Sequence, residues 1–182
     1  MKQNLKEYKV AILVAPGFEE SEMTKPRQVL DDAGAKTMLI SPESKSVYSW
    51  STNDWSKSYT VDLQLDMANP GDYDALLLPG GVINPDKLRL NKNAIDFIAR
   101  FGEMDKPIAA ICHGPWTLID AGLVNGKTLT SWPSIRIDLE NAGAKWVDKE
   151  VVIDGKLVTS RKPEDIPFFN EAMLKVFTQN RE

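Results

Sequence analysis

Three short apolar runs, each ended by a turn rich in glycine and proline, constrain the fold of this chain most strongly. The runs span residues 10–15, 75–78 and 108–111. The turns that follow them are Pro16-Gly17, Pro79-Gly80-Gly81 and Cys112-His113-Gly114-Pro115. An unbroken apolar run of about four to eight residues is typical of a strand that is buried on both faces, and such strands occur mainly in parallel sheets. The three runs therefore predict a parallel sheet.

Helical stretches separate the apolar runs. We predict helices over residues 21–33, 93–101, 115–121, 134–142 and 163–178. Three of them end in an Ala-Gly step, where glycine can take the left-handed conformation that closes a helix; these glycines are Gly34, Gly122 and Gly143. Because parallel strands need crossover helices, the alternation predicts an α/β fold, a three-layer α/β/α sandwich with a mostly parallel, flavodoxin-like sheet. We expect the 182 residues to form a single domain, 1–182.

Two stretches interrupt this alternation. The pattern of residues 151–158 predicts a hairpin that turns at Asp154-Gly155. Residues 44–59 are rich in Ser, Tyr and Trp and predict a loop or small hairpin that carries Trp50 and Trp55. These two tryptophans either form an aromatic binding surface or pack the loop or a subunit contact.

Charge and composition exclude several classes of partner. The formal net charge is −4 and no run rich in lysine or arginine occurs, so nucleic acid is not expected to bind directly. The sequence has no apolar run of membrane-spanning length and no signal-peptide pattern, so we expect a cytoplasmic protein without a membrane partner. One cysteine and one histidine can form neither an internal disulfide nor a Cys/His zinc site. No metal or cofactor is therefore expected.

Cys112, the only cysteine, follows the third apolar run. In open α/β sheets, ligands bind outside the carboxyl ends of the strands, so we expect residues 16–22, 79–88 and 112–116 to meet at one edge. A strand that turns sharply into a helix lifts the residue at the turn out of the sheet, as in the nucleophile elbow of hydrolases. Gly114-Pro115 would place the thiol near a helix N-terminus, which lowers a thiol pKa. We predict a reactive cysteine; the alternative is a small buried apolar side chain.

His113, the only histidine, is next to this cysteine. Successive side chains diverge on a regular strand or helix, so only an irregular elbow would bring its ring to the Cys112 thiol. The histidine serves either as a base or proton shuttle beside the thiolate, or it is bonded to the backbone or faces a subunit boundary.

Two acidic residues, Glu19 and Glu22, lie in the first of the segments expected at this edge. A protonated glutamate near the thiolate could donate a hydrogen bond to it or relay a proton. The alternative is the ordinary preference for acidic residues in the first turn of a helix. Gly80 and Gly81 follow the second apolar run, where they could present backbone N–H groups to a substrate oxygen as an oxyanion hole, or form a plain turn.

Together these residues resemble the superfamily that holds the PfpI-type intracellular proteases and the Parkinson-associated deglycase, which is related to the class I glutamine amidotransferases. The resemblance runs nearly from end to end of the chain. Residues 110–116, Ala-Ile-Cys-His-Gly-Pro-Trp, are similar to the nucleophile motif of the PfpI branch. Four further stretches occur in the family's order, at residues 17–22, 78–81, 130–134 and 159–163.

The resemblance implies a role for each residue at this edge. Glu22 takes the place of the glutamate that hydrogen-bonds the reactive cysteine, and Glu19 takes a neighbouring acidic position. Gly80 and Gly81, with the backbone after Cys112, take the place of the oxyanion site.

The resemblance also implies an active site near a subunit interface. In PfpI-type proteases an acidic residue of the adjoining subunit orients the histidine, and Asp86 matches that residue. The stretch between the two glycines and Pro85 is one residue longer here than in the PfpI pattern. A homodimer or a larger homo-oligomer is therefore expected.

One departure from the superfamily pattern excludes one of the activities found in the superfamily. Amidotransferases use a second histidine far downstream of the cysteine, and this chain has Lys162 in the comparable stretch. Glutamine amidotransferase activity is therefore not expected.

The leading hypothesis is a cysteine-dependent enzyme that attacks carbonyl groups, a hydrolase of deglycase or glyoxalase type. The resemblance suggests methylglyoxal-type aldehydes or their protein adducts as substrates, in stress defence. The alternative enzyme is a PfpI-type intracellular cysteine protease that acts on peptides. Two non-enzymatic alternatives are a redox-sensing stress protein or chaperone in which Cys112 is oxidised to sulfinate, and a binding module that uses Trp50 and Trp55.

Overall fold

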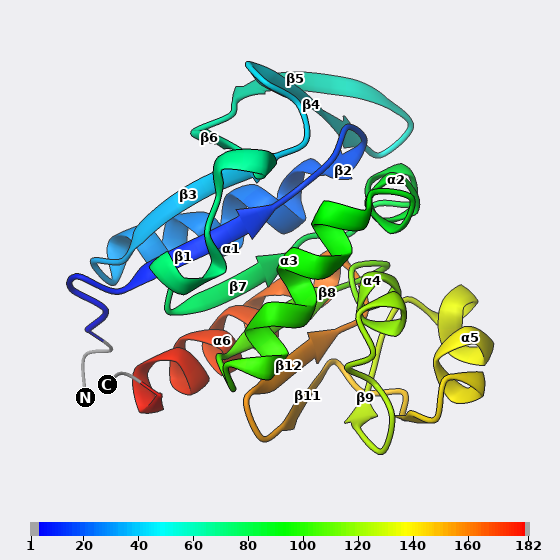
Figure 1. Ribbon diagram of the computed structural model, residues 1–182. Coiled ribbons are helices and arrows are strands. Elements are labelled where there is room, and N and C mark those ends of the chain that lie inside the picture. The colour runs from blue at the N-terminus through cyan, green and yellow to red at the C-terminus, as the bar shows by residue number, and fades with distance from the viewer. Residues whose placement is uncertain (1–3, 181–182) are drawn as a thin grey trace.

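The computed structural model describes residues 4–180. Its centre is a seven-stranded sheet with the strand order β11-β12-β8-β7-β1-β3-β6 (Figure 1). In that order the strands are β11 (Val151–Asp154), β12 (Leu157–Ser160), β8 (Ile108–Ile111), β7 (Ala75–Leu78), β1 (Lys9–Leu13), β3 (Lys36–Ser41) and β6 (Leu63–Gln64). Neighbouring strands run parallel except β11 and β12, which form an antiparallel hairpin as predicted.

Helices cover both faces of this sheet, so the predicted three-layer α/β/α sandwich is confirmed. One face carries α1 (Glu20–Asp32) and α6 (Ile166–Gln179), and the other carries α3 (Lys92–Glu103), α4 (Trp116–Asp120) and α5 (Arg136–Asn141). Successive residues of β1 alternate between the two cores: Val10 and Ile12 belong to the first, and Ala11 and Leu13 to the second. Burial on both faces is the reason that the strand sequences are apolar without interruption.

The three apolar runs form the adjacent strands β1, β7 and β8. Val10 pairs with Ala75 and Leu78 pairs with Ala110, so the carboxyl ends of these strands lie at one edge of the sheet. The predicted glycine helix ends are also confirmed, with φ of +92° at Gly34, +72° at Gly122 and +91° at Gly143.

Several elements of the fold are not predicted by the sequence pattern. Among them are the strands β3 and β6 and the helix α2 (Ile83–Arg89), which carries Pro85 in its first turn, a position where a helix tolerates proline. Helix α4 is shorter than its predicted range of 115–121. The remaining helical turns are η1 (Leu65–Met67), η2 (Pro70–Asp72), η3 (Pro133–Ile135) and η4 (Pro163–Asp165).

Two small sheets flank the large one. The first contains β2 (Phe18–Glu19), β4 (Ser46–Ser51) and β5 (Asp54–Thr60), and the second contains β9 (Thr128–Leu129) and β10 (Lys145–Trp146). The hairpin predicted within residues 44–59 is β4–β5, and β2 pairs with β4 so that Glu19 lies beside Trp50. Glu20 ties the hairpin to α1, since it accepts a hydrogen bond from Ser49 Oγ (2.8 Å) and forms a salt bridge with Lys57 (3.2 Å).

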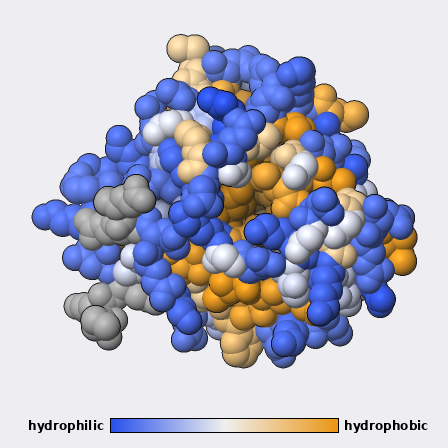
Figure 2. All heavy atoms as spheres, turned by 60° about the horizontal axis from the view of Figure 1, so that its bottom comes forward, coloured by the Kyte–Doolittle hydropathy of each residue, from blue (hydrophilic) through white to orange (hydrophobic). Residues whose placement is uncertain are grey.

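Polar side chains dominate the rim of the face that is turned forward in Figure 2, and apolar side chains gather nearer its centre, where the surface is hollowed. None of the helices within residues 4–180 is long and apolar enough to cross a membrane.

Candidate active site

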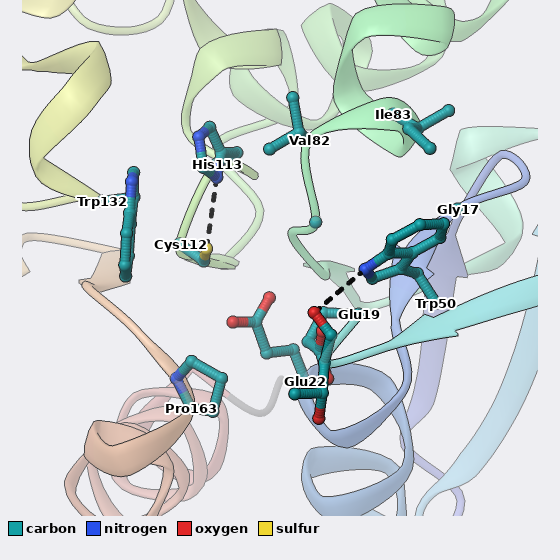
Figure 3. Close-up of a pocket in the computed structure, with 12 residues that line it drawn as sticks. Gly17, Glu19, Glu22, Trp50, Val82, Ile83, Cys112, His113, Trp132 and Pro163 are labelled. Atoms are coloured by element: carbon teal, nitrogen blue, oxygen red, sulfur yellow. Dashed lines mark hydrogen bonds between the residues drawn. The ribbon is translucent and has the colours of Figure 1, made fainter. Parts of the chain in front are cut away.

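The loops after β1, β7 and β8 surround a cavity of about 380 Å³ at the carboxyl edge of the sheet. The predicted meeting of these three segments is therefore confirmed. Figure 3 shows Cys112 and Glu22 in the middle of the site, with His113 and Trp132 on one side. The residues that line the cavity are Gly17, Glu19, Glu22, Trp50, Thr52, Gly81, Val82, Ile83, Cys112, His113, Trp132 and Pro163.

Cys112 occupies a sharp turn directly after β8. Its φ is +62°, a left-handed conformation that residues other than glycine rarely adopt. The turn is held because Cys112 N–H donates to Ser160 O (3.0 Å) and Trp132 N–H donates to Cys112 O (2.9 Å). A Cβ atom at Gly114 would lie 2.5 Å from Leu78 O, so glycine is the residue that fits there. The structure thus has the predicted elbow at Cys112.

The elbow turns the His113 ring toward the thiol. His113 Nδ1 lies 3.3 Å from Cys112 Sγ, and His113 Nε2 lies 3.2 Å from Ser134 Oγ. The ring also stacks on Trp132, with the ring centroids 5.9 Å apart. Burial lowers the pKa of His113 to about 4, so the imidazole is neutral near pH 7. A neutral imidazole in contact with a thiol can accept the thiol proton.

Glu22 is fully buried beside the same thiol. Its Oε2 accepts a hydrogen bond from Gly80 N–H (3.0 Å), while its Oε1 has no N–H or O–H partner among residues 4–180. Burial and then the negative charge of Glu19 raise the pKa of Glu22 to about 8, and an interaction with the Cys112 thiol opposes this rise only in part. Glu22 is therefore a protonated acid at neutral pH, able to donate a hydrogen bond or a proton.

The pKa of the Cys112 thiol is raised, so the expectation that a helix N-terminus lowers it is wrong. Burial raises this pKa, and so does the charge of Glu22 once that acid has itself ionised; the backbone N–H groups of Gly81 and His113 lower it without cancelling the rise. The helix effect is weak because α4 begins only at Trp116 and contains five residues. The thiol must therefore pass its proton to a group within reach, and His113 is such a group.

Gly80 and Gly81 have different roles in the loop after β7. The N–H of Gly80 donates to Glu22, so it is not available to a substrate oxygen, and the predicted oxyanion role of Gly80 is corrected. The backbone N–H groups of Gly81 and His113 donate to the Cys112 sulfur, so they are the backbone donors placed at the reacting atom. At Gly80 a Cβ atom would lie 2.7 Å from the Cβ of Cys112, which excludes any larger residue.

Asn84 is a fully buried residue that the sequence pattern does not identify as part of the site. Its Nδ2 donates hydrogen bonds to the carbonyl oxygens of Pro79 and Gly80 (3.0 Å each), and its Oδ1 accepts one from Ala15 N–H (2.7 Å). Asn84 therefore ties the glycine loop to the chain that leaves β1.

Other residues of the site also lie outside the predicted set. Trp132 and Ser134 contact the His113 ring, and their signal in the sequence is the similarity of residues 130–134 to the superfamily. Trp50 lines the cavity, and Trp55 packs edge-on against it with ring centroids 5.7 Å apart. The hairpin thus contributes a wall of the site.

The two remaining predicted residues differ in their position. Glu19 lines the cavity, where it accepts a hydrogen bond from Ser21 Oγ (3.3 Å) and where burial raises its pKa. Asp86 is exposed on α2 and does not line the cavity of this chain. Its contact with His113 of a neighbouring subunit stays a prediction.

Comparisons with known proteins agree with one another. The model of the DJ-1/PfpI family matches residues 8–176. General stress protein 18 of Bacillus subtilis is 42% identical over 167 residues, which cover 91% of this chain and 95% of that protein. Protein/nucleic acid deglycase 2 of Escherichia coli is 40% identical over 169 residues, which cover 92% of this chain and 96% of that protein.

Solved structures show the same relationship. DJ-1beta of Drosophila melanogaster matches with a TM-score of 0.84 and 28% identity, over 96% of this chain and 95% of that chain. DJ-1 of Schizosaccharomyces pombe matches with a TM-score of 0.80 and 25% identity, over 94% of this chain and 96% of that chain.

Proposed function

Because the chain belongs to the DJ-1/PfpI family, we propose that it is a cysteine-dependent deglycase-type enzyme. Its proposed substrates are small reactive aldehydes such as methylglyoxal and the adducts that they form on proteins. Relatives at 40% and 42% identity are named deglycases, and a stress protein among the relatives supports a role in stress defence. The observation that carries the proposal is the Cys112 thiol, held between the neutral His113 ring and the buried acid Glu22 at one cavity.

The first proposed step is transfer of the thiol proton to His113 Nδ1, which lies 3.3 Å from the sulfur. Because burial lowers the pKa of His113 and raises that of the thiol, the imidazolium–thiolate pair is a minor species, which forms as the sulfur attacks the substrate. The N–H groups of Gly81 and His113 and the O–H of Glu22 supply hydrogen bonds to the thiolate. The raised pKa of the free thiol is the reason that a neighbouring base is needed.

The thiolate next adds to the aldehyde carbon of the substrate. A C–S bond forms, the carbonyl π electrons move to oxygen, and Glu22 supplies the proton that this oxygen takes up. A proton then moves from this carbon to the adjacent carbonyl carbon through an enediol, which turns the hemithioacetal into a thioester and the ketone into an alcohol. Water hydrolyses the thioester, so methylglyoxal and one water give one 2-hydroxy acid. In an amine adduct the former aldehyde carbon carries a hydroxyl group and the amine nitrogen, so the thiolate takes the place of the amine: the C–S bond forms, the C–N bond breaks, and Glu22 supplies the proton with which the amine leaves. The same hemithioacetal results, so an amine adduct and one water give the same acid and the free amine.

The size of the cavity favours a small carbonyl substrate over a peptide. Its volume of about 380 Å³ lies toward the lower end of ligand pockets, and Trp50 and Trp132 form its side walls. Peptide hydrolysis needs a longer cleft. The intracellular protease is therefore the alternative candidate rather than the preferred one.

A homo-oligomer is proposed as the active form, with Asp86 of a neighbouring copy beside His113. Asp86 is exposed on α2, and Val82 at the cavity has 57% of its surface exposed, which supports an open face at this edge. Sedimentation velocity tests this proposal, and a monomer at working concentration contradicts it.

The test of the function compares wild type with Cys112→Ser on methylglyoxal, on its adduct with N-acetylarginine and on a peptide. We expect wild type to release a 2-hydroxy acid from the first two, and Cys112→Ser to lose about 100-fold or more in kcat. Glu164→Gln is the control, because Glu164 is exposed and does not line the cavity.

Each other outcome selects a different function. Equal activity of wild type and Cys112→Ser contradicts the cysteine mechanism. Cleavage of the peptide without turnover of aldehyde supports the protease. Selective oxidation of Cys112 by dilute peroxide, without turnover of any substrate, supports the redox sensor.

A further inference from the structure

One wall of the cavity pairs a carboxylate with an aromatic ring. Glu19 in β2 and Trp50 in β4 are register partners on neighbouring strands, and both line the cavity. Figure 3 shows them together on the side away from His113 and Trp132. The indole is held in place, since Trp50 Nε1 donates a hydrogen bond to Thr52 O (3.4 Å).

The cavity carries the carboxyl group of Glu19 without a compensating cation. Within the part of the chain that the structure describes, no lysine or arginine lines the cavity, and Glu19 and Glu22 form no salt bridge. Glu22, the second carboxyl group at the cavity, is protonated and interacts with the Cys112 thiol, so it does not compete for a cation. Glu20, the next residue after Glu19, has Lys57 as its counter-ion outside the cavity. Glu19 accepts hydrogen bonds from Ser21 and from the backbone N–H of Thr52, but residues 4–180 place no cation beside it. A cation would stabilise its carboxylate further.

We propose that Glu19 and Trp50 form a subsite for a cationic group of the substrate, a protonated amine or a guanidinium. The carboxylate attracts the cation by charge, and the indole attracts it through a cation–π interaction. The proposal rests on the proposed function, because the cation is part of a molecule whose carbonyl carbon reaches Cys112. The preferred substrates are then aldehyde adducts of amines and guanidines, as formed on lysine and arginine side chains. An adduct of a thiol brings no cation to this wall.

The arrangement of the site separates binding from proton transfer. Cys112 and Glu22 lie between the wall formed by Glu19 and Trp50 and the wall that contains His113. A substrate carbon at the thiol therefore has one side turned to each wall. A cation held at the first wall leaves the second wall free for the proton transfers of His113.

The kinetic test compares Glu19→Gln with wild type on methylglyoxal and on its adducts with N-acetylarginine, N-acetyllysine and N-acetylcysteine. We expect KM for the arginine and lysine adducts to rise about tenfold, while kcat and the constants for the other two substrates stay within about twofold. Trp50→Leu should give the same pattern with a rise of about threefold. An equal loss on all four substrates, or an unchanged KM for the arginine and lysine adducts, overturns the subsite.

Glu164→Gln is the matched control for this test. Its charge also acts on Glu22, but its side chain does not line the cavity, so it should leave all four substrates unchanged. A selective rise of KM in Glu164→Gln equal to that in Glu19→Gln overturns the assignment of the effect to Glu19.

A binding measurement separates the subsite from the chemistry. Butylguanidinium is titrated into Cys112→Ser and into Cys112→Ser/Glu19→Gln, with neutral butylurea as the control and tryptophan fluorescence as the readout. We expect butylguanidinium to bind the single variant about tenfold more tightly, and butylurea to bind both equally. If this holds while wild type turns over no aldehyde, the proposed function fails and the subsite is supported. Equal binding of butylguanidinium by both variants overturns the subsite.

Discussion

Replacement of the buried acid Glu22 by glutamine should stabilise the fold at neutral pH. Burial raises the pKa of Glu22 from 4.5 to about 8 in the folded chain, and unfolding returns it to its ordinary value of 4.5. Between these values the unfolded chain has lost the proton that the folded chain keeps, so a rise in pH favours the unfolded chain. Each pH unit above 4.5 costs about 1.4 kcal/mol of stability, until the folded carboxyl also ionises near pH 8.

The size of the effect follows from these two pKa values. At pH 7 the cost is about 3 kcal/mol, and Glu22→Gln removes it because an amide does not ionise. The amide oxygen can keep the hydrogen bond from Gly80 N–H. For a chain of this size, 1 kcal/mol shifts Tm by roughly 2–4 °C, so Tm should rise by roughly 6–12 °C at pH 7. At pH 4 the wild-type carboxyl is largely protonated in both states, so the difference should largely vanish.

Thermal unfolding followed by circular dichroism at several pH values measures this effect. Glu20→Gln is a control of opposite sign, because hydrogen bonds from Ser56 and Ser49 and the charge of Lys57 lower the pKa of Glu20 to about 2. A lowered carboxyl pKa stabilises the fold above pH 4.5 and loses that effect as pH falls toward 2, so Glu20→Gln should lower Tm at pH 7. The reasoning is refuted if Glu22→Gln is no more stable than wild type at pH 7. It is also refuted if the gain in Tm is as large at pH 4 as at pH 7.

Two further predictions concern activity. Wild-type kcat/KM should fall above about pH 8, because Glu22 there loses the proton that it supplies. It should also fall toward pH 4, because a protonated His113 cannot accept the thiol proton. A pH profile of kcat/KM that stays flat to pH 10 contradicts the role of Glu22. Asn84→Ala should lower kcat more than it changes KM and should cost about 1–3 kcal/mol in urea unfolding, because Ala15 N–H and Gly80 O lose their buried partner. An unchanged kcat would mean that the glycine loop keeps its position without Asn84.

The parts of the fold that can be predicted from sequence have local causes. Strands β7 and β8 are recognisable because burial on both faces requires apolar residues throughout, and a glycine or proline follows each strand closely. The elbow is recognisable because Gly114-Pro115 follows a short apolar run. The contact between His113 and the thiol can be predicted only on the condition that the elbow forms, since the contact depends on the left-handed backbone at Cys112.

The parts that cannot be predicted depend on residues far apart in the chain. Asn84 bonds to Ala15 across 69 positions, and Gly80 N–H reaches Glu22 across 58 positions, so no local pattern contains either contact. The prediction that the Cys112 pKa is lowered is wrong for the same reason, because burial by the whole fold outweighs the effect of the short helix that follows. Trp50 joins the cavity only because β4 pairs with β2.

The attachment of the β4–β5 hairpin has a consequence for how this fold diversifies. Cys112 and the glycine loop extend from strands that are hydrogen-bonded in register, so their relative position is as fixed as the sheet. Trp50 belongs to a hairpin whose strand pairing with β2 involves only Phe18 with Ser49 and Glu19 with Trp50. Insertions or exchanges in the hairpin can therefore change which molecules are admitted without moving the reacting groups. Substrate range and reaction can evolve separately, because one is set by the cavity-facing side chains of a hairpin anchored through the buried Val47, and the other by the central scaffold.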